Sequence, residues 1–484
     1  MRYFYSVGSS KTQGLTIILN ANPPMKTKLT ALAIATGALC SSFASAEEAK
    51  ASYTLIKNVN VFDGRNDKLS NGSSVLIENN LIKSVGKGLK APEGATVIDG
   101  GGRTLMPGLI DMHSHLAIHE GMLDGRDGFD QMAIGALTQE RLRSYLDQGF
   151  TTARDLGGNV LGVSKARRLD RIPGPKIYPC GGFLSQTGGH GDTGRFNDYI
   201  GEVDYLEKNG FSYVVDGVPE VLKAARHNLR AGATQLKIMG GGGVASEFDP
   251  LHMTQFSLEE MKAAVSVAND YGTYACVHAY HDSSVNRAID AGVKCIEHNF
   301  LTTEKTIIRM KKEGIALSCQ AVMSLVAFAN PESITFFNAD QKAKGKRVNA
   351  GATQMFEWAV KHDILMVTGG DMFGVKDGPN QASNMTKMKD VGVTPFKILK
   401  MGTSDAANVI GWCGDMNPYK DAYPTLSADE KAEKGIGLGV IEPGAYADLI
   451  LIEGNPLENI DLLLDYKNNM KVIITDGKVW KNSL

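Results

Sequence analysis

The chain has 484 residues, of which 43% are hydrophobic and 21% are charged, and its formal net charge is −2. This composition is that of a globular protein long enough for a large core or two domains, and it excludes collagen-like and low-complexity chains. Nothing in the charge balance indicates a nucleic-acid partner. The one short basic cluster is typical of a solvated helix face rather than a binding patch, and consists of Lys342, Lys344, Lys346 and Arg347.

The N-terminus has the layout of a secretory signal peptide. Residues 1–24 fit no part of such a signal and form an upstream extension. Residues 25–46 carry two lysines, then a short apolar run, then the small-x-small cleavage site Ala44-Ser45-Ala46. The apolar run is too short to span a membrane. We therefore expect a signal at about residues 25–46 and a periplasmic or secreted mature protein without a membrane span; the alternative is a plain apolar N-terminal helix.

Short strands with tight turns are predicted at both ends of the remaining chain. Residues 53–107 contain strand candidates at 53–62, 74–78 and 96–98, which end in Asp-Gly or Asn-Asn turns that are typical of hairpins. The same texture returns after residue 435, with candidates at 439–441, 448–452, 471–475 and 478–480. We expect residues 53–107 and 435–484 to form one small flanking β domain, a β-sandwich built from both chain ends.

Between them, residues 108–434 alternate short apolar strands with amphipathic helical stretches, such as 219–231, 258–271 and 354–361. The eight strand candidates are 109–116, 151–156, 176–184, 235–239, 273–279, 294–300, 316–321 and 365–369. Repeated strand–helix alternation predicts a parallel sheet, and eight units favour a closed (β/α)₈ TIM barrel over an open sheet. The fold class is therefore α/β. Long stretches at 185–218 and 322–350 are typical of lids or binding loops.

Two histidines, His113 and His115, lie at the end of the first barrel strand. Residues i and i+2 of a strand point the same way, so both imidazoles are expected to face the barrel axis at its C-terminal mouth. A His-x-His pair alone is a weak motif. Its position after Pro107-Gly108-Leu109 on a buried strand, and the further ligand types described next, give it weight.

Three more residues with metal-binding side chains follow other strands. His278 ends the fifth strand candidate, His298 ends the sixth, and Asp371 follows the eighth. Each alone is commonly a core histidine, a turn or a helix cap. Together they all fall where barrel active sites lie. Imidazole and carboxylate ligands without clustered thiolates favour zinc or a similar divalent ion.

The fourth strand contributes Lys237 between Leu236 and Ile238. A lysine in an apolar strand is costly unless it is neutralised or paired. One route is reaction with CO₂ to give an anionic carbamate, whose two oxygens can bridge two cations. A structural or snorkelling lysine is the alternative, and the residues alone favour that alternative.

Taken together, the motifs resemble the amidohydrolase superfamily over about residues 53–484. The resemblance rests on Pro107–His115, on Lys237, on the strand-end histidines with Gly369-Gly370-Asp371, and on Ala447-Asp448-Leu449-Ile450. Within it, RHNLRAGATQLK at 226–237 and GGHGD at 188–192 are similar to a binuclear subgroup of metal-dependent dipeptidases and carboxypeptidases. That subgroup is prolidase-like and imidazolonepropionase-related, and it includes ochratoxin-type amidases.

The resemblance implies a pair of divalent ions, most simply Zn²⁺. His113, His115 and Asp371 would bind one ion, His278 and His298 the other, and a carboxylated Lys237 would lie between them. It also implies hydrolysis of an amide bond in a dipeptide or N-acyl amino acid by a hydroxide that bridges the metals. Asp371 would be the catalytic residue that takes the proton and passes it to the leaving amine.

Three residues are candidates for substrate binding. His190 lies in a Gly-rich run of the loop after the third strand, where it approaches a substrate carbonyl or only structures the loop. Tyr280 shares the strand face of His278 and has a hydroxyl for substrate. Arg154 ends the second strand and either binds a substrate carboxylate or pairs with an acid such as Asp155.

Other functions remain open. A cyclic-amide hydrolase or deaminase of the same superfamily is the main alternative, although deaminase members often lack the bridging lysine that Lys237 represents. A metal-binding assembly protein without catalysis is a remote one, because such relatives usually lose ligands and all six positions are filled here. The expected partner is a small-molecule or dipeptide substrate, and a homo-oligomer is compatible with the sequence.

Overall fold

The computed structural model describes residues 51–119, 122, 129–373 and 380–484. The upstream extension and the predicted signal at 25–46 lie outside these ranges. Residues Ser52–Leu484 fold as one unit. No helix within the described ranges combines the length and the apolar character that crossing a bilayer requires.

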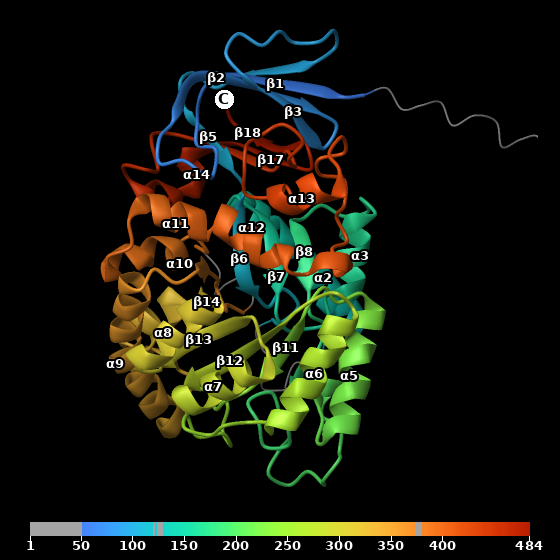
Figure 1. The fold of residues 1–484 in the computed structure, drawn as a ribbon, viewed down its shortest axis with the longest axis vertical. Coiled ribbons are helices and arrows are strands. Elements are labelled where there is room, and N and C mark those ends of the chain that lie inside the picture. The colour runs from blue at the N-terminus through green and yellow to red at the C-terminus, as the bar shows by residue number, and fades with distance from the viewer. Residues whose placement is uncertain (1–50, 120–121, 123–128, 374–379) are drawn as a thin grey trace, which may run out of the picture. The chain divides into compact units, whose positions relative to one another are not determined.

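Strands from both chain ends form a single sheet, in which the blue N-terminal and red C-terminal strands lie side by side (Figure 1). Its order is β18-β17-β16-β5-β1-β2-β3, with β4 pairing β1. The bounds are β1 Tyr53–Val61, β2 Ser70–Glu78, β3 Leu81–Gly86, β4 Thr96–Asp99, β5 Thr104–Pro107, β16 Leu449–Ile452, β17 Met470–Thr475 and β18 Lys478–Asn482. The sheet confirms that the two ends of the chain associate, whereas the sandwich arrangement stays a prediction.

Turn residues explain where these strands end. Asp476 and Gly477 connect β17 to β18, and both have positive φ angles, +49° and +71°. A turn with two consecutive left-handed residues matches the right-handed twist of the hairpin strands. The Asp-Gly sequence adopts this turn conformation at low cost. Residues 439–441, predicted as a strand, are instead irregular.

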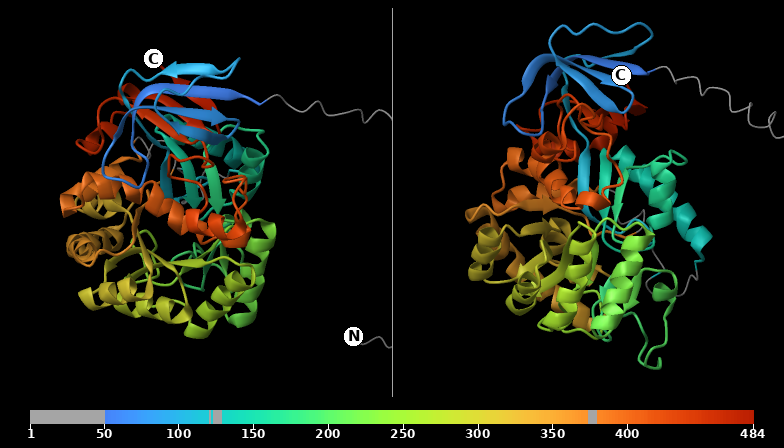
Figure 2. Two further views of the ribbon diagram at one scale, coloured as in Figure 1. Left: turned by 45° about the horizontal axis from the view of Figure 1, so that its top comes forward. Right: turned by 45° about the vertical axis from the view of Figure 1, so that its right-hand side comes forward.

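The remaining strands are parallel and alternate with helices that lie outside them (Figures 1 and 2). One sheet has the order β6-β7-β8 and the other β10-β9-β11-β12-β13-β14-β15. Their bounds are β6 Leu109–Ser114, β7 Phe150–Asp155, β8 Lys176–Pro179, β9 Phe183–Ser185, β10 Ser212–Val214, β11 Leu236–Met239, β12 Ala275–His281, β13 Cys295–Leu301, β14 Ala316–Cys319 and β15 Met366–Thr368. The predicted α/β class is confirmed.

The predicted third strand, 176–184, is wrong as one element. It is two strands, β8 and β9, separated by Gly181, whose φ of +73° breaks the extended backbone. An additional strand, β10, lies in the long loop that follows. Within the described residues the ladders stop between β8 and β9 and between β15 and β6. Closure of the strands into a barrel therefore stays a prediction.

The larger crossover helices pack an apolar face on the strands. In α5 the buried positions include Val221, Ala225 and Leu229, spaced by four residues. Helix α6 begins with a capping box between Ser257 and Glu260. These helices are α2 Gln131–Asp147, α3 Leu161–Arg168, α5 Val218–Ala231, α6 Leu258–Asp270, α7 Asp282–Ala291, α8 Glu304–Glu313 and α9 Ala339–Lys361. The shorter ones are α4 Tyr205–Lys208, α10 Ser383–Thr386, α11 Pro395–Met401, α12 Ser404–Gly411, α13 Ala428–Lys434 and α14 Tyr466–Asn469.

Helix α9 carries the basic cluster noted in the sequence. Lys346 is solvated, with 60% of its side chain exposed, as predicted for a surface helix face. Lys344 is different: its side chain is 7% exposed, and Nζ donates to the carbonyl oxygens of Ser246 and Asp249 at 3.0 and 3.2 Å. The prediction of a purely solvated face is therefore wrong for Lys344, which holds the loop after β11.

Candidate metal centre

Three of the predicted ligands converge at the carboxyl ends of β6 and β15. Nε2 of His115 and Nε2 of His113 lie 3.1 and 3.5 Å from Oδ1 of Asp371. One ligand atom from each residue falls within 4.8 Å of the others. Asp371 follows β15 with φ +53°, and its backbone N–H donates to the carbonyl oxygen of His113 at 2.7 Å. The strand ends thus place two imidazoles around one carboxylate, as predicted.

Burial and neighbouring charges keep His113 and Asp371 in the protonation states that metal ligands require. Burial and the charge of Lys237 lower the pKa of His113, which favours the neutral ring. Burial alone would raise the pKa of Asp371, but the neighbouring histidines outweigh it and hold the pKa far below its usual range. Neutral imidazoles beside a carboxylate are the donor set that divalent metals bind.

His278 and His298 complete the cluster from β12 and β13. Their rings lie 4.5 Å apart between centroids, and the ring of His298 is 5.0 Å from that of His113. Nδ1 of His298 lies 3.9 Å from Oδ2 of Asp371 and is buried without a hydrogen-bond partner. Burial lowers the pKa of both histidines well below the ordinary value. An unpartnered buried nitrogen on a neutral ring fits a metal ligand.

His298 reaches the cluster through an unusual backbone. In the parallel ladder, Glu297 is paired with His278, and His298 is paired with Ala279. Regular alternation would therefore turn the side chain of His298 to the face opposite His278. His298 and Asn299 instead have φ angles of +76° and +61°, values that are uncommon outside glycine. This left-handed turn directs the ring inward, and such strained backbone is concentrated at functional sites.

Lys237 lies on β11 beside these rings. Lys237 is 1% exposed. In the parallel ladder it is paired with Cys276, which precedes His278 by two residues on β12. Its charge lowers the pKa of His113, His278 and His298. Among the described residues, no hydrogen bond or ion pair reaches its Nζ. Burial to this degree argues against a snorkelling lysine, whereas the structural and the carboxylated lysine both stay predictions.

Glu297 on β13 is a further residue of this cluster, and the sequence pattern assigned it no role. Its carboxylate is fully buried and accepts from His113 Nδ1 at 2.9 Å and from Arg154 Nη2 at 2.7 Å. Burial would raise its pKa, but the Arg154 guanidinium and the His113 ring hold the pKa well below its usual range. The bond to Nδ1 leaves Nε2 of His113 directed at Asp371, and such partners orient metal-binding histidines.

This arrangement corrects the substrate-binding prediction for Arg154. The side chain is fully buried, and its Nε donates to the carbonyl oxygen of Met112 at 2.7 Å while Nη2 is bound by Glu297. Arg154 therefore fills the alternative role, a structural pair with an acid. That acid is Glu297 on β13 rather than the neighbouring Asp155.

The other two substrate-binding candidates lie beside the cluster. The ring of His190 stacks on His278 with centroids 4.0 Å apart and 17° between the planes. The ring of Tyr280 is 4.8 Å from that of His278. Burial raises the pKa of Tyr280 well above its ordinary value, so the hydroxyl stays a hydrogen-bond donor. Their contact with substrate stays a prediction.

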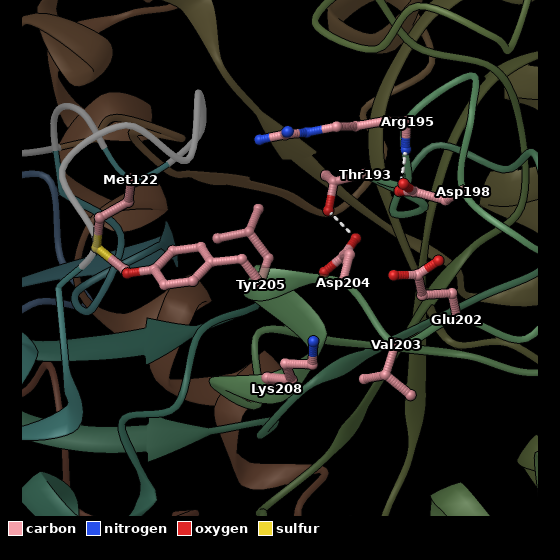
Figure 3. Close-up of a pocket in the computed structure, with 10 residues that line it drawn as sticks. Met122, Thr193, Arg195, Asp198, Glu202, Val203, Asp204, Tyr205 and Lys208 are labelled. Carbon is pink, nitrogen blue, oxygen red and sulfur yellow. Dashed lines mark hydrogen bonds between the residues drawn. The ribbon is translucent and has the colours of Figure 1, made fainter.

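A separate cavity of about 220 Å³ lies along the loop between β9 and β10 (Figure 3). Its lining includes Thr193, Asp204 and Tyr205, and none of the predicted site residues lines it. Thr193 donates to the carboxylate of Asp204, and the backbone N–H of Arg195 donates to Asp198 at 2.6 Å. Hydrogen bonds between residues of the same loop thus stabilise its conformation beside the cavity.

Comparisons with known proteins place the chain in a family. The model of the amidohydrolase family matches residues 104–422. Ochratoxinase from Aspergillus niger is 28% identical over 439 residues, which cover 88% of this chain and 85% of that protein. A solved prolidase complexed with N-methylphosphonate-L-proline is 29% identical with a TM-score of 0.79, over 89% of this chain and 100% of that chain.

A solved Xaa-Pro dipeptidase with bound methionine is 28% identical, with a TM-score of 0.75 over 89% of this chain and 100% of that chain. These similarities match the subgroup that the motifs suggested. Members of the superfamily generally bind divalent metals, in keeping with the cluster of His113, His115 and Asp371. The chain therefore belongs to the amidohydrolase family and is a hydrolase that acts on carbon–nitrogen bonds.

Proposed function

We propose that this protein hydrolyses the amide bond of a dipeptide or an N-acyl amino acid with the aid of two divalent metal ions. The observation that carries the proposal is the convergence of five nitrogen and oxygen donors around the buried side chain of Lys237, for which the described residues show no ion pair. The donors are His113, His115, His278, His298 and Asp371.

The two ions, for which the donor set favours Zn²⁺, divide the ligands between them. His113, His115 and Asp371 would hold one, and His278 and His298 the other. Lys237 would join them as a carbamate, formed when its neutral amine bonds to the carbon of CO₂ and loses a proton. This reaction would turn a buried amine into an anion that two cations could share. The burial of Lys237 and its lack of a partner support the carbamate.

The residues of the chain then act on the substrate in complementary ways. When bound, the metals supply a hydroxide at neutral pH and polarise the scissile carbonyl. Asp371 accepts the proton of the nucleophile and delivers it to the nitrogen of the leaving amine. Tyr280 and His190, whose rings contact that of His278, would offer donors to the oxyanion that develops on the carbonyl.

The substrate class rests on the names of the similar proteins. Ochratoxinase, prolidase and Xaa-Pro dipeptidase point to an amide between an acyl group and an amino acid, with proline among the candidates for the released residue. The buried lysine argues against a deaminase, for which no bridging group is needed, and the complete ligand set argues against a non-catalytic assembly protein.

We also propose that the two parallel sheets close into a (β/α)₈ barrel and that the end strands form a β-sandwich. The family match over residues 104–422 supports the barrel. Export to the periplasm or the medium is proposed on the signal-like segment 25–46 alone.

The test is a substrate panel. The protein would be reconstituted with zinc in the presence of bicarbonate, and release of free amino acid would be measured from Xaa-Yaa and Xaa-Pro dipeptides, N-acyl amino acids and cyclic amides. We expect turnover of at least one linear amide. Turnover of cyclic amides alone would favour the alternative function, and no turnover of any amide by protein with two bound metals would refute the proposal.

A further inference from the structure

The ring of His190 is held by one of its two nitrogens. Nδ1 lies 2.6 Å from Oγ of Ser246 and 3.1 Å from Oδ2 of Asp249. Among the described residues, no hydrogen-bond partner contacts Nε2, and 16% of the side chain is exposed. The ring lies flat on His278. The contacts at Nδ1 thus fix the ring and leave Nε2 free.

Asp249 provides the buried carboxylate that contacts Nδ1 of His190. It is fully buried, and its Oδ2 also accepts from the backbone N–H of Gly243 at 2.8 Å. Burial alone would raise its pKa, but hydrogen bonds from His190, Ser246 and Gly243 together lower it. A buried carboxylate is costly unless it is paired, and His190 is the ring that pairs with it.

The loop around Asp249 is shaped for the ring. A Cβ on Gly243 would lie 2.0 Å from Cε1 of His190, so only glycine allows the ring to approach this closely. Helix α9 holds the same loop: Gln341 donates to the carbonyl oxygen of Ala245 at 2.5 Å, and Lys344 donates to that of Asp249. Helix α9 therefore holds the backbone of this loop, while the side chain of Asp249 contacts His190.

We propose that Asp249 is a positioning residue for the hydrolytic reaction: it holds His190 by Nδ1, so that the ring stays stacked on His278 with Nε2 free for the substrate carbonyl. The inference rests on the proposed function, in which His190 contacts substrate. A residue that only stabilised the loop would not need to bond a ring that stacks on a predicted metal ligand, and variants of Asp249 distinguish the two roles.

The first experiment is a double-mutant cycle on the metal-loaded enzyme with the best linear amide of the panel. Asp249→Ala should lower kcat/KM about 10- to 100-fold, the range for partners that orient active-site histidines, with bound metal unchanged. His190→Ala/Asp249→Ala should be no slower than His190→Ala, because Asp249 acts through His190. Asp249→Asn, which keeps an acceptor oxygen, should recover part of the loss.

A matched control is Asp216→Ala. Asp216 is an exposed carboxylate that binds Thr187 at the start of the same long loop and makes no contact with His190. It should leave kcat/KM unchanged. Wild-type kcat/KM in Asp249→Ala, multiplicative losses in the double variant, or an Asn variant as slow as the Ala variant would each overturn the proposal.

A crystal structure of metal-loaded Asp249→Ala judges the inference without turnover. We expect the His190 ring to leave its stack on His278 while the loop backbone stays in place. A ring that remains stacked would overturn the positioning role. Failure of the proposed function would appear differently, as a wild-type enzyme that is inactive toward every amide.

Discussion

Glu297→Gln tests whether the buried pair behind His113 governs metal binding. The substitution keeps the size of the side chain but removes the charge that Arg154 and His113 contact at 2.7 and 2.9 Å. Arg154 is then a buried guanidinium without a counter-charge, which costs about 3–5 kcal/mol. His113 loses the acceptor that orients its ring, which weakens metal binding about 10- to 100-fold.

The stability effect can be converted into a melting temperature. With an unfolding entropy of roughly 2.1 cal/mol/K per residue over about 430 residues, each degree corresponds to about 0.9 kcal/mol. Glu297→Gln should therefore lower the melting temperature of the metal-free protein by about 3–6 °C. Calorimetry measures this change, and competition with a chelating dye measures the metal affinity.

The matched control is Glu313→Gln. Glu313 pairs with Arg309 at 2.8 Å, but on the exposed surface of α8, where such pairs contribute little. Neither its melting temperature nor its metal affinity should change. Wild-type metal affinity in Glu297→Gln would refute the claim that this pair orients His113, even if the protein were destabilised.

Three further changes follow from the same structure. Lys237→Ala should reduce bound metal below the two equivalents of wild type by elemental analysis, whereas exposed Lys294→Ala should not; full occupancy in Lys237→Ala would argue against a bridging carbamate. Asp371→Asn should lower kcat about 10²- to 10⁴-fold at matched metal content, because its amide cannot accept the proton; an active variant would remove Asp371 from the proton path. Burial opposes ionisation of Asp476, but Lys176 and Arg167 lower its pKa to about 2 from the ordinary 3.8. Its stabilising contribution is therefore complete above pH 4 and is lost as the pH falls toward 2. The difference in melting temperature between wild type and Asp476→Asn should narrow over that range, and a constant difference would contradict the pKa assignment.

Strand periodicity was sufficient to predict that most of the candidate metal ligands lie close together. His113 and His115 are two residues apart at the end of β6, His278 lies in the second half of β12, and Asp371 follows β15. The carboxyl ends of parallel strands meet at one edge, so a local pattern predicts a shared location. The sequence therefore predicts that His113 and Asp371, more than 250 positions apart, meet at one candidate site.

Other features depend on geometry that no periodic pattern records. His298 faces the cluster only because its φ is +76°, which regular alternation does not predict. The break at Gly181 turned one expected strand into two. Arg154 pairs with Glu297 and not with its sequence neighbour Asp155, and Asp249 contacts His190, which lies 59 positions earlier in the chain. Which charges pair is decided by tertiary packing, so sequence spacing alone could not identify these partners.

The metal dependence of amide hydrolysis tests the central claim most directly. Purified protein would be stripped of metal with a chelator and titrated with zinc in bicarbonate buffer while release of amino acid from the best linear amide is followed. The account predicts no turnover by the stripped protein and full recovery near two equivalents of zinc per chain. Turnover that survives complete stripping, or that saturates at one equivalent, would contradict a two-metal amide hydrolase.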